Sequence, residues 1–286
     1  MIYDRRSLMQ GLAGLSALAP FLSLERAMAA VAPLSVEEAT MRAAEAHGAL
    51  MAVPGMRMHA GETVSMLIYP GFTAMDLVGP HYFFASMMGA KVELVTNQPT
   101  LEPVKSDLGL AIAPTARLND AFETPTILFA PGGGAGTVAA MDHPATIDYL
   151  RDRGSRATYV TSVCTGSLLL GMAGLLKGRK ATSHWAGRSV LPEFGATPVD
   201  ARVVTDGNVI TGAGVSAGLD FGLAMVEKLR GRPYAKALML QAEYSPEPPF
   251  KGGTPATTDP AIAKAVAGMM GPVEARARAV ARKVKT

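Results

Sequence analysis

Apolar and amphipathic segments alternate along the chain from Thr63 onward. The apolar runs TVSMLIYP (63–70), KVELVTN (91–97), TILFAPGGG (126–134) and ATYVTSVC (157–164) are typical of buried strands. Between them, DLVGPHYFFASMM (76–88), HPATIDYLRDRG (143–154) and TGSLLLGMAGLL (165–176) are typical of helices. Strands that are apolar on both faces and alternate with helices form mainly parallel sheets covered on both sides. We therefore expect a three-layer α/β sandwich, with a core domain over residues 63–245.

Further elements complete this pattern. Asp206-Gly207 separates two β-rich runs and predicts a hairpin, after which residues 215–231 return to helix. Residues 30–62 are expected to form an N-terminal arm, in which Ser35 and Glu38 predict a capped helix start. The Pro/Gly-rich stretch 244–260 predicts a loop, and residues 246–286 are expected to form a C-terminal arm and helix.

The first residues have the three regions of an export signal in order. Arg5 and Arg6 precede an apolar stretch over 12–22, and small residues follow at Ala27 and Ala29. This order predicts a twin-arginine signal peptide over residues 1–29 and a periplasmic mature protein. An ordinary N-terminal helix carrying two arginines is the alternative. No later segment has about twenty uninterrupted apolar residues, so we expect no stable membrane insertion after signal removal.

Composition narrows the possible partners. The 286 residues include 49% hydrophobic and 18% charged residues, which is enough to build one large core. The formal charge is only +3, and no basic stripe is interleaved with aromatics, so we expect no nucleic-acid partner. The basic tail EARARAVARKVKT (274–286) is interpreted as the solvated end of a helix. No Cys/His cluster has zinc-like spacing and no GxGxxG opens the first βα unit, so no metal or organic cofactor is expected.

The single cysteine, Cys164, lies where a predicted strand turns into a predicted helix. Backbone N–H groups at such a turn stabilise a thiolate, which predicts a thiol pKa below the usual value of about 8.5. A buried cysteine that serves only as a small hydrophobe is the alternative.

Two other segments end strands at the same edge of the predicted sheet, where ligands bind in this class of fold. Asp76 follows the first strand, where its carboxylate either caps the next helix or acts as an acid or base. Gly132 to Gly134 follow another strand, where they form either a tight turn or a set of backbone donors for a developing negative charge.

Four stretches resemble the ThiJ/PfpI superfamily, whose fold is flavodoxin-like and places a cysteine on a strand-to-helix nucleophile elbow. They are SVCTGSLLLGMAGLLKGRKATSHW (162–185), LIYPGFTAMDLVGP (67–80), FAPGGGAG (129–136) and VITGAGVSAGLDFGL (209–223). Within the superfamily, the Asp in the second stretch and the Cys-Thr pair at the elbow are most similar to the isonitrile hydratases. That branch hydrates an isonitrile to an N-substituted formamide without a cofactor.

The resemblance implies a role for each matching residue. Cys164 corresponds to the nucleophile, Asp76 to the acid/base carboxylate, and Thr165 to the residue whose backbone or hydroxyl supports the site. Gly133 and Gly134 match the loop of backbone donors. His184 falls where relatives place a histidine near the cysteine, although a histidine that simply packs beside Trp185 fits equally well.

The resemblance leaves the activity and the assembly open. A glyoxalase or deglycase reaction also uses a cysteine and a carboxylate, and a non-enzymatic protein could instead bind a ligand or respond to oxidation through Cys164. Relatives commonly form homodimers through the first helix, so we expect a homodimer involving the segment PHYFFASMM (80–88) and a small-molecule substrate.

Overall fold

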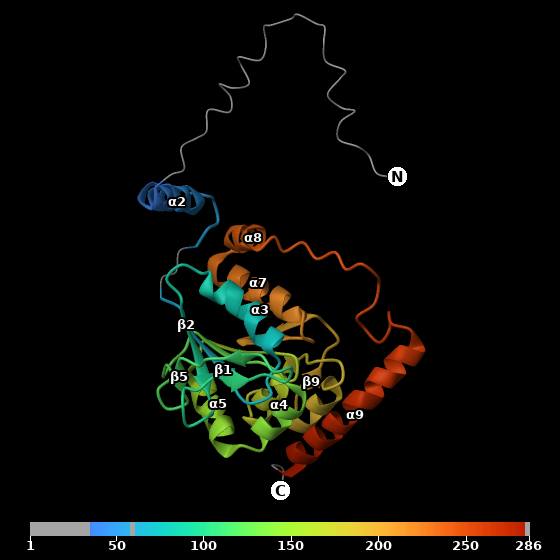
Figure 1. The fold of residues 1–286 in the computed structure, drawn as a ribbon. Helices are drawn as coiled ribbons and strands as arrows, with labels where there is room; N and C mark the ends of the chain where they lie inside the picture. The colour runs from blue at the N-terminus through green and yellow to red at the C-terminus, as the bar shows by residue number, and fades with distance from the viewer. Residues whose placement is uncertain (1–34, 58–60, 284–286) are drawn as a thin grey trace, which may run out of the picture. The chain divides into compact units, whose positions relative to one another are not determined.

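A computed structural model of the protein describes residues 35–57 and 61–283 (Figure 1). The predicted signal peptide, residues 1–29, lies outside the described residues. The chain divides into two compact units, of which the first ends at Ala52 and the second begins at Val53. In the first unit, α2 (Val36–Met51) begins with the predicted capping box: Ser35 Oγ accepts the Glu38 N–H, and Glu38 Oε2 accepts the Ser35 N–H.

A seven-stranded sheet forms the centre of the second unit, in the order β10-β11-β7-β6-β1-β2-β5. All neighbouring pairs are parallel except β10 and β11. The strands are β1 (Thr63–Ile68), β2 (Lys91–Thr96), β5 (Ala116–Arg117), β6 (Ile127–Ala130), β7 (Tyr159–Val163), β10 (Val203–Asp206) and β11 (Val209–Gly212). The hairpin predicted at Asp206-Gly207 is confirmed by the antiparallel pairing of Asp206 with Val209.

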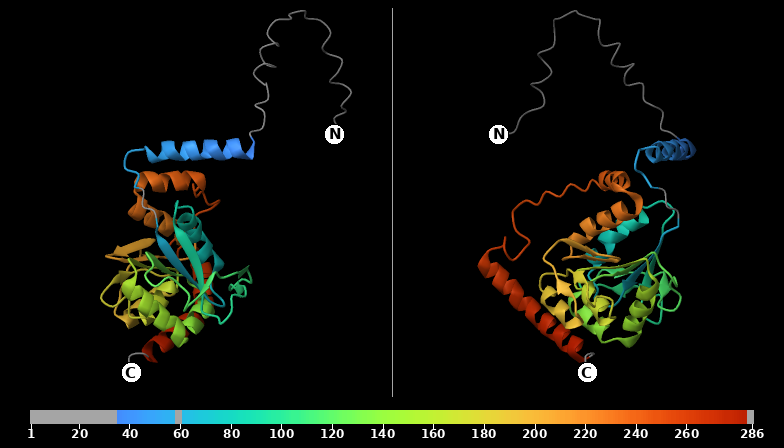
Figure 2. Two further views of the ribbon diagram at one scale, coloured as in Figure 1. Left: turned by 90° about the vertical axis from the view of Figure 1, so that its left-hand side faces the viewer. Right: turned by 180° about the vertical axis from the view of Figure 1, so that it is seen from behind.

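Helices cover both faces of this sheet (Figures 1 and 2). One layer contains α3 (Ala74–Ala85), α7 (Ala217–Arg230) and α8 (Arg232–Gln241). The other contains α4 (Gly134–Met141), α5 (Pro144–Arg156) and α6 (Gly166–Met172), together with the 3₁₀ helix η1 (Arg188–Phe194). The three-layer α/β sandwich that the alternating pattern predicts is thus confirmed.

One part of the core lies between the sheet and the α3/α7 layer. Phe84 makes edge-to-face contacts with Phe129 of β6 and Phe221 of α7, and all three rings are fully buried. Gly222 allows α7 to approach α3, because a Cβ there would lie 2.8 Å from the Phe83 ring. Apolar residues on each element therefore fix the layers against the sheet.

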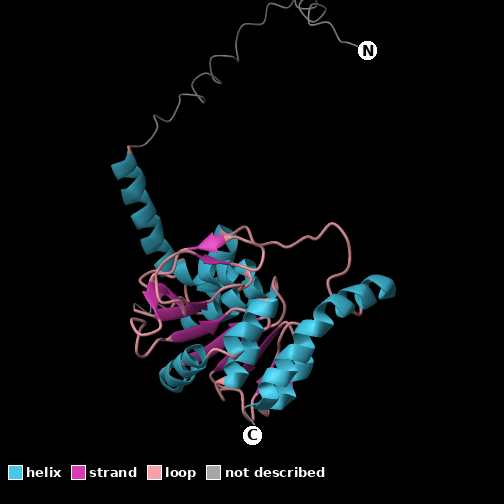
Figure 3. Cartoon of the chain, turned by 60° about the horizontal axis from the view of Figure 1, so that its bottom comes forward, coloured by secondary structure: helices cyan, strands magenta, loops and turns pink. Residues whose placement is uncertain are grey.

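Short elements occupy the rim of the sheet. β3 (Val104–Lys105) pairs with β4 (Ala111–Ile112), and β8 (Lys180–Ala181) with β9 (Thr197–Pro198). An extended, mostly exposed loop follows α8 and leads into the C-terminal helix α9 (Pro260–Lys283), as Figure 3 shows. α9 belongs to the same compact unit as the sheet. Among the described residues, no helix is both long and apolar enough to cross a membrane.

Candidate active site

Cys164 lies on a strained turn between β7 and α6. Its φ angle is +58°, a left-handed conformation that side chains other than glycine rarely adopt. Its N–H donates to the carbonyls of Gly212 and Ala213, and its carbonyl accepts the hydroxyls of Ser167 and Ser183. Because both backbone groups are bonded, the strain is held in place, as in a nucleophile elbow.

A glycine after the elbow permits this turn. A Cβ at Gly166 would lie 2.1 Å from the carbonyl oxygen of Ala130, so any side chain there would push α6 away from β6. Gly166 was not predicted as part of the site, although a glycine directly after Cys-Thr is visible in the sequence.

Asp76 does not cap its own helix. The N-cap of α3 is Thr73, and the side chain of Asp76 turns instead towards the loop after β6, where its Oδ2 accepts the Gly132 N–H at 2.9 Å. The residue is fully buried, and its Oδ1 has no hydrogen-bond partner in the described part of the chain. A Cβ at Gly132 would lie 2.8 Å from Asp76 Oδ2, so only glycine fits there. The structure thus excludes the interpretation of Asp76 as a helix cap.

The Asp76 carboxyl and the Cys164 thiol are close enough to shift each other's pKa. Burial raises the pKa of Asp76 from 3.8 to about 7, although the Cys164 thiol and the Gly132 N–H favour the carboxylate. Burial also raises the pKa of Cys164 well above its usual range, and the charge of Asp76 adds to the rise. A carboxyl with this pKa is suited to proton transfer at neutral pH.

The prediction of a Cys164 pKa below about 8.5 is therefore wrong for the free protein. Cys164 is only 5% exposed, so a thiolate loses most of its hydration. The backbone N–H of Thr165 does favour the thiolate. It does not outweigh burial, and α6 is only seven residues long.

The Thr165 hydroxyl belongs to a hydrogen-bonded chain whose direction can be assigned. Tyr69 donates its single hydroxyl proton to the Pro131 carbonyl at 2.8 Å, so its oxygen must accept from Thr137 at 3.0 Å. Thr137 in turn must accept from Thr165 at 2.9 Å. Thr165 Oγ1 then has its proton engaged and accepts the Gly133 N–H at 3.1 Å. The hydroxyl thus fixes the glycine loop, and both the backbone N–H and the side chain of Thr165 lie close enough to the sulfur to favour its thiolate.

The two predicted donor glycines have different positions. The N–H of Gly133 is occupied by Thr165, and a Cβ at Gly133 would lie 2.4 Å from the Gly71 carbonyl oxygen. Gly134 lines the cavity beside Cys164, has a φ of +41° and is the first residue of α4, where an N–H has no partner within the helix. The structure therefore leaves Gly134 as the donor candidate and makes Gly133 a packing residue.

His184 combines both interpretations that the sequence allowed. Its ring lies 5.4 Å from the Trp185 ring, and it also lines the same cavity as Cys164. Its Nδ1 accepts the Ala186 N–H at 3.3 Å, so the neutral ring carries its proton on Nε2. Burial and the Arg188 charge lower its pKa, which keeps the ring neutral at physiological pH.

The cavity at Cys164 has a volume of about 630 Å³. Its lining is mostly apolar and comes from several elements: Thr73, Ala74, Met75, Val78, Ser106, Asp107, Leu108, Leu110, Gly134, Cys164, Thr165, Leu168, His184, Ala186, Gly187, Val215, Met270, Val273, Glu274 and Ala277. Sequence reasoning missed the last four, which belong to α9. It also missed Tyr69 and Thr137, whose hydroxyls form the hydrogen-bonded chain that ends at Thr165. The described residues contain no group of three or more His, Cys, Asp or Glu side chains that could hold a metal ion.

Comparisons with known proteins agree with this geometry. The model of the DJ-1/PfpI family matches residues 62–228. Over 199 residues the chain is 44% identical to a Pseudomonas putida protein named isonitrile hydratase, covering 70% of this chain and 86% of that protein. A crystal structure of a ThiJ/PfpI family protein from Pseudomonas syringae is 51% identical, with a TM-score of 0.77, and covers 81% of this chain and 94% of that one.

A more distant relative carries a different name. The glutathione-independent glyoxalase DJR-1.2 of Caenorhabditis elegans is 29% identical over 139 residues, which cover 48% of this chain and 74% of that protein. The family match spans the whole of the main sheet from β1 to β11 and includes both Asp76 and Cys164. The matching region includes the Cys164 elbow, and the chain belongs to the DJ-1/PfpI family.

Proposed function

We propose that this protein is a cysteine-dependent hydratase that adds water to an isonitrile, R–N≡C, and releases the formamide R–NH–CHO. The observation that carries the proposal is the buried Asp76 carboxyl, with a pKa of about 7, beside the thiol of Cys164 at the wall of an apolar cavity. The 44% identity to the P. putida protein named isonitrile hydratase supports the same reaction class.

In the first half of the reaction the thiol adds across the terminal carbon. The sulfur of Cys164 bonds to that carbon while the carboxylate of Asp76 takes the thiol proton. Asp76 Oδ1 is the available acceptor because Oδ2 is bonded to Gly132. The carbon becomes basic as the C–S bond forms, and Asp76 returns the proton to it. The product is a thioimidate, Cys–S–CH=N–R, and Asp76 is again a carboxylate.

In the second half water replaces the sulfur. Asp76 takes one proton from a water molecule whose oxygen bonds to the thioimidate carbon, and that proton passes to the nitrogen. The C–S bond then breaks as the C=O bond forms, and the remaining hydroxyl proton returns to the sulfur. The Thr165 N–H, which favours a thiolate at Cys164, stabilises the departing sulfur. One water molecule is consumed, and Cys164 and Asp76 return to their starting states.

The direct test is turnover of a panel of isonitriles, methylglyoxal and simple amides by purified protein. We expect formamide from isonitriles, and we expect Cys164→Ser and Asp76→Asn to lower kcat/KM by 100-fold or more, on the order of a lost catalytic proton transfer. Asp148→Asn is the matched control, because that carboxyl is exposed on α5 and pairs with exposed Arg151. Formamide production that survives both active-site substitutions would contradict the proposal.

A glyoxalase-type reaction is the second candidate, and the name of the C. elegans relative favours it. The methylglyoxal arm of the panel distinguishes the two. The redox-responsive alternative has less support, because oxidation of a cysteine follows thiolate character and exposure. Cys164 is buried, which lowers both its exposure and the fraction of thiolate.

We further propose a periplasmic location and a homodimeric assembly. The first rests on Arg5, Arg6 and the Ala27-x-Ala29 site. The second rests on the apolar surface of α3, where Met75, Val78 and Tyr82 are 53%, 45% and 37% exposed.

A further inference from the structure

The C-terminal helix α9 forms one wall of the Cys164 cavity. Met270, Val273, Glu274 and Ala277 line the cavity, and their spacing places them on a single face of the helix. On the adjoining face Ala277, Val280 and Ala281 are buried, where α9 packs on α4 and η1. The segment predicted to be a C-terminal arm therefore completes the site.

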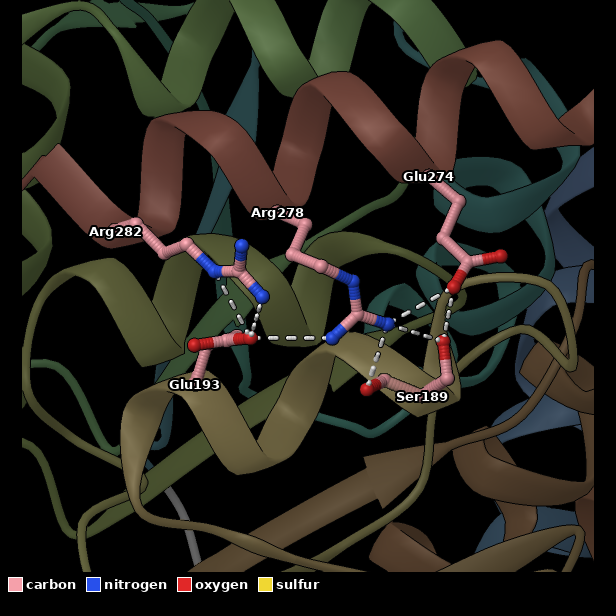
Figure 4. Close-up of polar contacts among 5 residues, drawn as sticks. All are labelled: Ser189, Glu193, Glu274, Arg278 and Arg282. Atoms are coloured by element: carbon pink, nitrogen blue, oxygen red, sulfur yellow. Dashed lines mark hydrogen bonds and ion pairs between the residues drawn. The ribbon is translucent and has the colours of Figure 1, made fainter.

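A polar cluster centred on Arg278 holds this wall in place (Figure 4). Arg278 donates to Glu193 at 3.1 Å, to Glu274 at 3.0 Å and to the carbonyl and hydroxyl oxygens of Ser189 at 3.1 and 3.0 Å. Ser189 also donates to Glu274, and Arg282 also pairs with Glu193. The Ser189 and Arg278 contacts lower the pKa of Glu274, so its carboxylate stays ionised and bonded at the edge of the cavity.

The interpretation of the basic tail as a solvated helix end is thus wrong for Arg278. Its side chain is only 29% exposed and bridges η1 to α9. By contrast, the preceding loop is exposed along almost all of residues 245–259. The position of α9 therefore depends on the Arg278 cluster and on the buried alanines and valine.

On the basis of the proposed function, we infer that α9 selects the substrate by the size of its apolar substituent. Met270 and Val273 face the same space as Cys164, and a cavity of about 630 Å³ is far larger than the reacting N≡C group needs. Arg278 is a positioning residue that acts by holding α9.

Filling the cavity from α9 tests the selection directly. We expect Val273→Trp to lower kcat/KM for cyclohexyl isocyanide by about 10-fold or more relative to its effect on methyl isocyanide, which is the scale of a pocket-size effect. Met269→Trp is the matched control, because Met269 is 74% exposed on the same helix and does not line the cavity. Equal losses for both substrates, or none for either, would overturn the inference.

Loosening the wall tests the role of Arg278. We expect Arg278→Leu to raise KM for cyclohexyl isocyanide several-fold without changing kcat for methyl isocyanide, and to speed hydrogen exchange in α9. Arg276→Leu, a substitution of an exposed arginine on the same helix, provides the control. Faster exchange without a change in KM would show that Arg278 has only a structural role.

An alkylation experiment separates failure of this inference from failure of the proposed function, because it needs no turnover. In wild type and Val273→Trp, Cys164 is labelled with iodoacetamide and with the bulkier N-benzyl iodoacetamide. We expect Val273→Trp to slow only the bulky reagent. If wild type hydrates no isonitrile but this selectivity is seen, α9 is the wall of a site with another substrate. If wild type hydrates isonitriles and neither assay shows selectivity, α9 plays no part.

Discussion

At neutral pH the Cys164 thiol holds its proton tightly, while the Asp76 carboxyl is near the midpoint of its titration. The pair is therefore suited to a reaction in which the thiol proton is removed only as sulfur attacks. A resting thiolate is not required. This arrangement keeps the buried thiol weakly reactive towards oxidants until a ligand enters.

The pKa of Asp76 gives the activity a definite pH dependence. Asp76 must be a carboxylate to accept the thiol proton, so kcat/KM is expected to fall below pH 7 and to rise through an inflection near pH 7 as Asp76 ionises. In Asp76→Asn this inflection should be absent and the residual rate should follow the titration of Cys164 at higher pH. A wild-type profile that is flat from pH 5 to 9 would contradict the acid/base role.

The strand ends predicted that Cys164 and Asp76 lie at one edge of the sheet, and the family resemblance supplied their roles as a pair. Cys164 and Asp76 follow different parallel strands whose carboxyl ends meet at one edge of the sheet. The direction of the thiol pKa was not predictable, because it depends on burial, which a sequence motif does not report. Thr137 and Tyr69 were missed for a similar reason, since their hydroxyls meet Thr165 only after three elements have packed.

At the scale of elements, the continuous apolar runs predicted β1, β2, β6 and β7, and Asp206-Gly207 predicted the β10–β11 hairpin. Strands of two residues, such as β5, carry too little pattern to be found. The place of α9 was also hidden from the sequence, because a Pro/Gly-rich loop sets no direction for the helix that follows it.

A buried ion pair ties the end of α7 to the start of β1. Arg230 and Glu62 side chains are 0% and 2% exposed, and Arg230 Nη2 lies 2.5 Å from Glu62 Oε2. We expect Glu62→Ala to lower the free energy of unfolding by about 3 to 5 kcal/mol, because the Arg230 charge stays buried without its partner.

Urea denaturation measures this effect, and Glu227→Ala is the control. Glu227 pairs with Arg232 on the surface, where side-chain exposures are 43% and 72%. Loss of that pair should cost less than about 1 kcal/mol. Equal effects of the two substitutions would show that the Glu62 pair adds no special stability.

At the scale of the whole molecule, the proposed homodimer rests on a smaller surface than the apolar segment 80–88 implied. Phe83 and Phe84 are fully buried in the core, which leaves Met75, Val78 and Tyr82 on the exposed face of α3. We expect light scattering to give a dimer mass for wild type and a monomer mass for Val78→Asp. Leu240→Asp, on α8 and 81% exposed, should leave the dimer intact. A wild-type monomer at micromolar concentration would contradict the proposal.

Export of the folded protein is the second expectation at this scale. Replacing Arg5 and Arg6 together with lysine should hold the full-length protein in the cytoplasm, because the twin-arginine route reads the arginine pair. N-terminal sequencing of the exported wild type should begin near Ala30. An intact Met1 in a cytoplasmic wild type, unaffected by the double substitution, would contradict both the signal and the location.

The covalent intermediate tests the central claim most directly. Protein is mixed with cyclohexyl isocyanide and quenched with acid after milliseconds to seconds. The mass of the intact protein is then determined by mass spectrometry, and formamide is measured in the same samples. We expect wild type to gain the mass of one isonitrile at Cys164, and we expect the adduct to decay as formamide appears. Cys164→Ser should show neither adduct nor product. Formamide formed by Cys164→Ser at the wild-type rate would contradict a reaction through the thiol.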